Sequence, residues 1–289
     1  MLLMAGHSRR DILAAASALA LSGLLSRGEG GTMKNPRIAR VESVPLMYPT
    51  VGRFKFFESP DGKSTGRPAV LVKITADDGT VGIGQSVPVN RWSYETLETV
   101  HTTITRYLAP VLVGKQVFDA EGIEAAMNSV IAPSFSTGQP ICKAGLDLAL
   151  FDLTGRLLQQ TAGQRWNRTG RAKITLSWTL NPLKLDDVPG LIEEGRRRGY
   201  RHFNIKVAPD VRFDVELARL VKRLVPDGFL WADANGGYDE AAALEAAPKL
   251  ADAGVAVLEQ PVRPNRLSAL RKLKKQGALP IILDEGVVN

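Results

Sequence analysis

Cysteine is almost absent from this sequence: Cys142 is the only one in 289 residues. A single cysteine excludes an internal disulfide and any metal site built on paired cysteines. Apolar runs long enough to cross a membrane are also lacking. The apolar and small residues of 12–25 would form about 21 Å of helix, which is shorter than a hydrocarbon core of about 30 Å. We therefore expect no stable membrane insertion.

Clustered positive charge is missing as well, although the formal net charge is +7. The denser basic runs, RRRGYR at 196–201 and RKLKK at 271–275, both fall in segments with helical spacing. Binding to nucleic acid needs basic residues gathered on one surface. These runs are more typical of solvent-facing helix sides than of a phosphate-binding stripe. We expect no nucleic-acid partner.

Residues 1–32 have the layout of an export signal. Arg9 and Arg10 precede the apolar stretch 12–25, and polar, glycine-rich sequence follows it. The layout resembles a twin-arginine (Tat) leader, which a receptor reads as an address and which does not anchor the protein. It predicts a periplasmic protein. If translation starts at Met33 instead, the protein is cytoplasmic and the leader is only translated upstream sequence.

Residues 33–165 carry the pattern of an α+β domain. The segment 39–46 alternates like a strand, and 69–87 contains two β-rich runs joined by Asp-Asp-Gly-Thr, which is typical of a hairpin. Between these segments lies a long polar loop, and helical spacing takes over from about 93 to 160. A meander followed by helices predicts an α+β arrangement.

Residues 166–289 repeat a different unit, in which short apolar strands alternate with amphipathic helices. This alternation predicts βα units and a parallel sheet that is buried on both faces. About five strands can be counted before the sequence ends. The fold class that we predict is α/β: an incomplete TIM-type β/α barrel of about five strands, preceded by an α+β capping domain.

Charged residues follow the strands of this repeat. Lys206, Asp233, Glu259 and Asp284 stand at the ends of the second to fifth predicted strands. The carboxyl ends of parallel strands meet at one edge, where active sites of α/β proteins collect. Three converging carboxylates need a cation, and their oxygens suit Mg²⁺.

Two simpler interpretations compete with this metal cluster. Each acid could cap the helix that follows it, and Lys206 could be a strand-end lysine that extends its amine to solvent. Three acids in successive units, each directly after an apolar run, favour the cluster over the caps.

The sequence at 231–261, WADANGGYDEAAALEAAPKLADAGVAVLEQP, closely resembles the signature of the mandelate racemase/muconate lactonizing enzyme family of the enolase superfamily. KAGLDLALFDLTGR (143–156) is similar to the helix that precedes the barrel in that family. SWTLN (177–181) looks like its first barrel strand, and PIILDEG (280–286) like the strand with the third metal ligand. The resemblance covers about residues 37 to 289.

The resemblance implies a function for each of the strand-end residues. Asp233, Glu259 and Asp284 would bind Mg²⁺, and Lys206 would be a catalytic acid/base. The substrate would be a small carboxylate, because a divalent cation stabilises the charge that forms when a proton next to a carboxylate is removed. This combination of lysine and Mg²⁺ is the known arrangement of enolase-type sites.

The resemblance also implies supporting groups. Asn235 and Glu285 would stand beside the metal, and the loop of about 46–67 would close over the substrate. Asn204 takes the place of the first lysine in the Lys-x-Lys pattern that the family usually has on the second strand, which removes a positive charge near the substrate carboxylate. The full-length protein is expected to be a homo-oligomer.

The implied reactions are racemisation, epimerisation, cycloisomerisation or dehydration, catalysed by an isomerase or a lyase. Two other classes remain open: a Schiff-base aldolase-type barrel that uses Lys206, and a non-catalytic exported binding protein that depends on a metal. Family barrels continue with further strands that carry a second acid/base. We therefore expect the chain as given, which stops at Asn289, to be an inactive fragment by itself.

Overall fold

The computed structural model describes residues 35–49, 66–90, 93–134, 137–168, 170 and 173–287. The chain separates into two compact units, with the division between residues 171 and 172. We call them unit 1 and unit 2. The predicted leader at 1–32 lies outside the described residues, as does most of the predicted cap loop, 50–65.

Unit 1 begins with an antiparallel sheet of β1 (Ile38–Tyr48), β2 (Arg67–Ala76) and β3 (Val81–Ser86), in the order β1-β2-β3. The predicted hairpin between β2 and β3 is confirmed, with the Thr80 carbonyl accepting from the Ala76 N–H at 2.9 Å. Gly79 takes the positive φ of 86° that this tight turn requires.

The helices of unit 1 follow the sheet in the chain, as the change to helical spacing predicts. They are α2 (Leu97–Thr103), which continues through a π-helical turn (Ile104–Leu108) into α3 (Ala109–Leu112), then α4 (Ala120–Val130), α5 (Pro140–Leu158) and α6 (Ala162–Arg165). One face of β2 and the inner faces of α2 to α5 form a single apolar core, whose members include Val72, Ile74, Ile104, Leu108 and Leu146.

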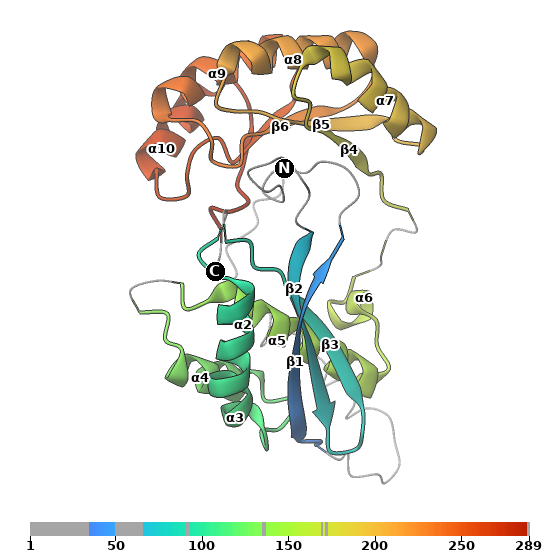
Figure 1. Ribbon diagram of the computed structural model, residues 1–289, viewed down its shortest axis with the longest axis vertical. Coiled ribbons are helices and arrows are strands. Elements are labelled where there is room, and N and C mark those ends of the chain that lie inside the picture. Colours follow the sequence, from blue (N-terminus) through green and yellow to red (C-terminus); the bar gives the residue numbers. More distant parts are fainter. Residues whose placement is uncertain are drawn as a thin grey trace. The chain divides into compact units, whose positions relative to one another are not determined.

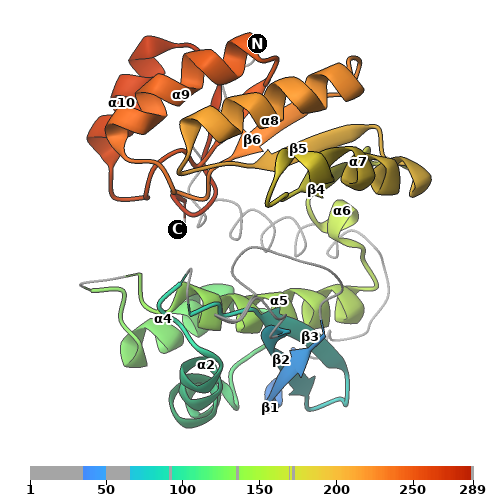
Figure 2. The same cartoon turned by 45° about the horizontal axis from the view of Figure 1, so that its top comes forward.

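The edge strand β3 lies directly against α5 (Figure 2). A Cβ on Gly84 would come within 2.0 Å of the Gly145 carbonyl oxygen, and Gly82 is equally crowded, so only glycine allows this approach. The Asp152 carboxylate of α5 accepts the outward N–H of Ile83 at 2.9 Å. The helix therefore covers and hydrogen-bonds an edge that would otherwise stay open.

The start of α5 is fixed by a buried carboxylate from another segment. Glu95 is 2% exposed and accepts the backbone N–H groups of Ile141 and Cys142, both at 2.8 Å. These N–H groups have no partner within the helix, so the Glu95 carboxylate caps the N-terminus of α5. Cys142 is completely buried beside it.

Cys142 is expected to be inert in the folded protein. Burial, with a further contribution from the Glu95 charge, raises the pKa of the Cys142 thiol to about 12 from an ordinary value of 9.0. Because the thiolate is the reactive form, a disulfide reagent at pH 8 should label the denatured chain quickly and the folded chain only when unit 1 opens.

The same pKa shift predicts a loss of stability in alkali. Between pH 9 and pH 12 the folded state keeps a thiol proton that the unfolded state releases, so the free energy of unfolding should fall as the pH rises through this window. Rapid labelling of the folded protein at pH 8 would contradict the buried placement.

Unit 2 is a five-stranded parallel sheet in the order β4-β5-β6-β7-β8, with α7 to α10 on one face (Figure 1). The strands are β4 (Ser177–Leu180), β5 (His202–Lys206), β6 (Leu230–Asp233), β7 (Val257–Glu259) and β8 (Ile281–Ile282). The helices are a 3₁₀ turn (Leu185–Asp187) with α7 (Val188–Arg197), then α8 (Val211–Leu224), α9 (Glu240–Asp252) and α10 (Leu267–Gln276). The predicted incomplete β/α barrel after an α+β domain is confirmed.

The core of unit 2 lies between the sheet and its helices. Each strand contributes alternate residues to it, among them Leu180, Phe203, Ile205, Ala232 and Leu258. The residues between these face the other side of the sheet. Within the described ranges, no helix is both long enough and apolar enough to span a membrane.

Candidate active site in unit 2

Three of the predicted site residues lie in one row across the sheet. Lys206 at the end of β5 pairs with Asp233 at the end of β6, and Asp233 pairs with Glu259 at the end of β7. Their neighbours in sequence, such as Ile205 and Ala232, belong to the helix-side core. The row therefore faces the side of the sheet opposite the helices.

The sequence suggested that Asp284 ends the fifth strand, but the structure places it beyond the end of that strand. The strand β8 ends at Ile282, which is the residue that pairs with Glu259, and Asp284 lies in the turn that follows. The strand is short because the Asp284 N–H bonds to the side-chain oxygen of Gln260 and not to its main-chain carbonyl. Asp284 nevertheless remains close enough to Asp233 and Glu259 to interact with both electrostatically.

Lys206 is held by two acceptors from β6 and the loop after it. Its Nζ donates to Asp233 Oδ2 and to Asn235 Oδ1, the latter at 3.1 Å. The Lys206 side chain is 12% exposed and that of Asp233 is 6% exposed. A paired amine that is largely withdrawn from water is different from a strand-end lysine that extends to solvent, so that simpler interpretation is wrong.

The helix-capping interpretation is also wrong for Asp233, because the helices before and after β6 are capped by other residues. The cap of α8 is Asp210, which accepts from the Arg212 and Phe213 N–H groups. The cap of α9 is Asp239, which accepts from the Ala242 N–H at 2.8 Å. Asp233 stands at neither helix start, so its position at the strand end needs another explanation.

The environment of Glu259 and Asp284 favours their neutral forms. Burial is the largest cause of the raised pKa of Glu259, and the charge of Asp233 adds to it. Burial is also the largest cause of the raised pKa of Asp284, and the charges of Glu285 and Asp233 raise it further. Bringing these carboxylates together therefore has a cost that a cation would remove.

One contact to Glu259 was not predicted from the sequence. The indole Nε1 of Trp231 donates to Glu259 Oε2 at 3.0 Å. Trp231 stands two residues before Asp233 on the same strand and therefore faces the same side. The two-residue spacing from Asp233 could have indicated that Trp231 faces the site. An aromatic residue in a strand, however, usually indicates packing in the core.

The predicted supporting residues lie around this row. Asn235 Nδ2 donates to Glu285 Oε1 at 3.2 Å, which joins the loop after β6 to the turn after β8. Asn204 is 6% exposed on β5, and its Oδ1 accepts no hydrogen bond from the described residues. A buried acceptor of this kind is expected to have a partner from outside the chain, either a water molecule or a ligand.

The donor set fits a hard divalent cation in its chemistry. Asp233, Glu259 and Asp284 offer only carboxylate oxygens, which Mg²⁺ prefers. Neighbouring negative charge contributes, after burial, to the raised pKa values of Glu259 and Asp284. Among the described residues, however, no three His, Cys, Asp or Glu side chains are arranged so that they could hold a metal ion as they stand. In its place the Lys206 ammonium neutralises Asp233.

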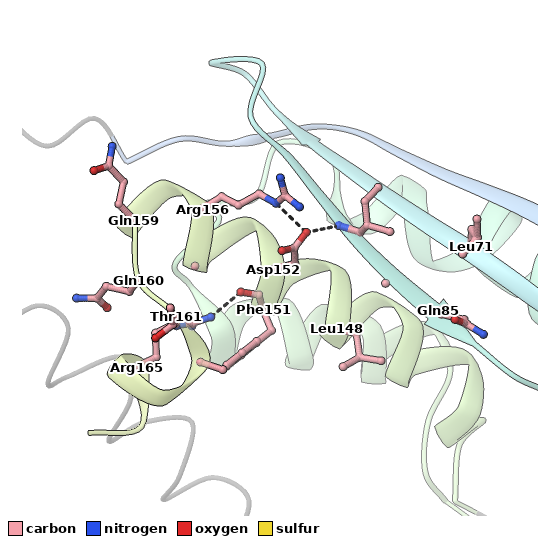
Figure 3. Close-up of a pocket in the computed structure, with 14 residues that line it drawn as sticks. Leu71, Gln85, Leu148, Phe151, Asp152, Arg156, Gln159, Gln160, Thr161 and Arg165 are labelled. Atoms are coloured by element: carbon pink, nitrogen blue, oxygen red, sulfur yellow. Dashed lines mark hydrogen bonds and ion pairs between the residues drawn. The ribbon is translucent and has the colours of Figure 1, made fainter. Parts of the chain in front are cut away.

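Unit 1 has a hollow of about 830 Å³ beside β3 and α5, which Figure 3 shows. Its charged groups are already engaged with the protein. Asp152 accepts from Arg156 Nε at 2.9 Å as well as from the Ile83 N–H. Arg165 donates to the Phe151 carbonyl at 2.6 Å and lies 4.0 Å from the centre of the Phe151 ring. These contacts join α5 to β3 and α6, so we assign them a structural role.

Comparisons with known proteins agree on one family. The model of the mandelate racemase/muconate lactonizing enzyme N-terminal domain matches residues 62–164, and the enolase C-terminal domain-like model matches residues 190–289. A chloromuconate cycloisomerase of Cupriavidus necator is 34% identical over 75% of this chain and 59% of its own length. An N-succinyl-L-Arg/Lys racemase of Bacillus cereus is 28% identical over 78% of this chain and 60% of its own length.

A solved structure is similar as well. The muconate lactonizing enzyme of Pseudomonas fluorescens, complexed with muconolactone, superimposes with a TM-score of 0.75 at 26% identity, over 88% of this chain and 67% of that chain. The chain described here spans about three fifths of the length of the curated relatives that it matches.

Proposed function

This chain belongs to the mandelate racemase/muconate lactonizing enzyme family of the enolase superfamily, and from that premise we propose that it serves a Mg²⁺-dependent isomerase acting on a small carboxylic acid. The reaction removes a proton from the carbon next to the carboxylate and ends in racemisation, epimerisation or cycloisomerisation. Relatives named as cycloisomerases and as a racemase support the isomerase class over a dehydrating lyase.

The alignment of Lys206, Asp233 and Glu259 across three neighbouring strands carries this proposal. It places one amine and two carboxylates in consecutive positions at the carboxyl ends of β5, β6 and β7. Parallel α/β sheets build their sites at this edge. An arrangement that served stability alone would not need to withdraw the Asp233 carboxylate and its paired Lys206 amine from water here.

Asp233, Glu259 and Asp284 are the residues that would hold the metal. A bound Mg²⁺ would supply stabilisation of the negative charge that develops on the substrate carboxylate. Asp233 and Glu259 stand at the ends of β6 and β7, and Asp284 lies just beyond β8. The Trp231 N–H on Glu259 Oε2 fixes one of these carboxylates. Fixed outer partners of this kind are typical of functional metal ligands.

Lys206 is the residue that we propose to move the proton. Its Nζ lies at the end of β5, and Asp233 Oδ2 and Asn235 Oδ1 hold it there. The side chain is largely withdrawn from water, which keeps solvent from competing for the proton. Asn204, two residues earlier on the same face, offers the unpaired Oδ1 to a hydroxyl or amide donor of the substrate.

The rival Schiff-base reaction fits this environment less well. A Schiff-base reaction needs the Lys206 amine to attack a carbonyl, and it needs no divalent cation. That reaction would also leave Glu259 and Asp284 without a role. Borohydride trapping of a carbonyl compound on Lys206 would support the aldolase class instead.

The test is exchange of the α-proton in heavy water. The full-length protein, given Mg²⁺ and a panel of hydroxy, N-acylamino and lactone carboxylates, should exchange the α-proton of at least one of them, with loss of exchange when a chelator removes the metal. Nuclear magnetic resonance of the α-proton signal measures the rate, and chiral analysis then distinguishes racemisation from cyclisation. A full-length protein that binds no Mg²⁺ in a calorimetric titration would contradict the proposal.

A further inference from the structure

Gln260 follows Glu259 directly and is completely buried. Its side chain makes three hydrogen bonds within the described structure. Oε1 accepts from the Asp284 N–H at 3.0 Å and from the Gly286 N–H at 2.9 Å, and Nε2 donates to the Val262 carbonyl at 2.9 Å. Both lone pairs of the amide oxygen therefore hold the turn that carries Asp284.

The Gln260 side chain replaces a bond that the main chain would otherwise make. Leu258 N donates to the Pro280 carbonyl at 3.0 Å and Gln260 N donates to the Ile282 carbonyl at 2.9 Å, which is the ladder of a parallel pair. The next step of that ladder would bring the Asp284 N–H to the Gln260 main-chain carbonyl. It reaches Oε1 instead.

The freed main-chain carbonyl has a different partner. Gln260 has a positive φ of 35°, which is uncommon for a residue with a side chain, and this conformation turns its carbonyl towards the loop after β6. There it accepts from the Gly236 N–H at 2.7 Å. One buried residue thus binds the loops that follow β6, β7 and β8.

Each of these three loops adjoins one proposed metal ligand. Asp233 precedes the first loop, Glu259 immediately precedes Gln260, and Asp284 lies in the third. We infer that Gln260 is a positioning residue that fixes Asp284 beside Glu259 and Asp233, and so sets the spacing of the three carboxylates. This inference rests on the proposed function for its metal, but the hydrogen bonds that it uses are independent of it.

The test compares Gln260→Met with the parent in the full-length protein. Methionine has similar length, but its thioether accepts hydrogen bonds only weakly. Loss of an outer partner of a metal ligand typically weakens binding by about 10- to 100-fold, and we expect a weakening of that size for Mg²⁺ alone in a calorimetric titration. Amide hydrogen exchange at Asp284 and Gly286 should speed up by at least about tenfold, because both N–H groups lose their acceptor.

The matched control is Gln276→Met at the end of α10. Gln276 Nε2 also donates to a backbone carbonyl, that of Leu244 at 2.8 Å, but away from the acids. This variant should keep the parent Mg²⁺ affinity and the parent exchange rates at Asp284 and Gly286. A loss of Mg²⁺ affinity in Gln276→Met equal to that in Gln260→Met would overturn the inference, because the effect would then be general.

A second variant decides the matter if Gln260→Met does not fold. A Cβ at position 286 would lie 3.1 Å from Gln260 Oε1, so Gly286→Ala should push the turn away from Gln260 without removing any polar group. We expect Mg²⁺ affinity to fall about threefold or more, in keeping with a partial loss of outer support. Parent-like affinity in this variant, or in a folded Gln260→Met, would overturn the inference.

Failure of the proposed function can be distinguished from failure of the Gln260 inference, because the two are read from different measurements. If the parent protein binds no Mg²⁺, the proposed metal site is wrong. Amide hydrogen exchange at Asp284 and Gly286 is then the only test of the positioning role of Gln260. Faster exchange at Asp284 and Gly286 in Gln260→Met then supports its positioning role. Unchanged exchange overturns that role whatever the parent binds.

Discussion

Replacing Lys206 by alanine is expected to lower the rate of α-proton exchange by about 10²- to 10⁴-fold, the usual contribution of a positioned acid or base. The variant loses the only amine whose Nζ contacts both Asp233 and Asn235 in the described part of the chain. Its Mg²⁺ affinity should be no weaker than that of the parent, because the ammonium no longer competes with the cation for Asp233. Exchange and calorimetry on the same preparation separate the two effects.

The control for this variant is Lys222→Ala in α8. Lys222 Nζ also has two oxygen partners, the Pro226 carbonyl at 2.8 Å and the Gly228 carbonyl at 3.0 Å. Both alanine variants therefore remove a hydrogen-bonded lysine from unit 2, and only Lys206→Ala should affect exchange. Exchange at the parent rate in Lys206→Ala would exclude lysine from the mechanism.

Asp233→Asn should weaken Mg²⁺ binding by at least about 100-fold, more than the loss of an outer partner does. Asparagine has nearly the same shape, and its Oδ1 can still accept from the Asn235 N–H, a bond of 2.8 Å in the parent. The turn after β6 is therefore retained while one carboxylate charge is lost. Calorimetric titration with MgCl₂ measures the change, and α-proton exchange should fall with it.

Asp239→Asn is the matched control. Asp239 lies in the loop that follows Asp233 and caps α9. It does not belong to the row formed by Lys206, Asp233 and Glu259. Asparagine is as good a cap as aspartate, so its stability and Mg²⁺ affinity should stay close to those of the parent. If Asp233→Asn and Asp239→Asn bind Mg²⁺ equally well, the acids at the strand ends are not the metal ligands.

The parts of unit 2 that could be predicted are those that one strand determines by itself. An apolar run that ends on a charged residue indicates where β5, β6 and β7 stop, and the structure has Lys206, Asp233 and Glu259 at those positions. Repetition of the βα unit then determines that the strands are parallel and that their ends share one edge. Fold class and the location of the row follow from these two facts.

The parts that could not be predicted depend on pairs of residues distant in sequence. The ion pair of Lys206 with Asp233 needs the register between β5 and β6, which no local pattern encodes. Asp284 was placed on a strand because the Ile-Ile-Leu run reads as one, yet the ladder passes from the main chain of Gln260 to its side chain at that point. A buried glutamine beside an acid gives no local signal of such an exchange.

The glycines at the contact between β3 and α5 have a consequence for synthesis of the chain on the ribosome. Gly84 emerges about 60 residues before Gly145, which at about 5–20 residues per second leaves about 3–12 s between the two. During that interval the Ile83 N–H lacks its Asp152 acceptor and the edge of the nascent sheet is open to strands of other chains. The close docking that protects the finished unit thus arrives late, and successive ribosomes on one messenger expose the same edge one after another.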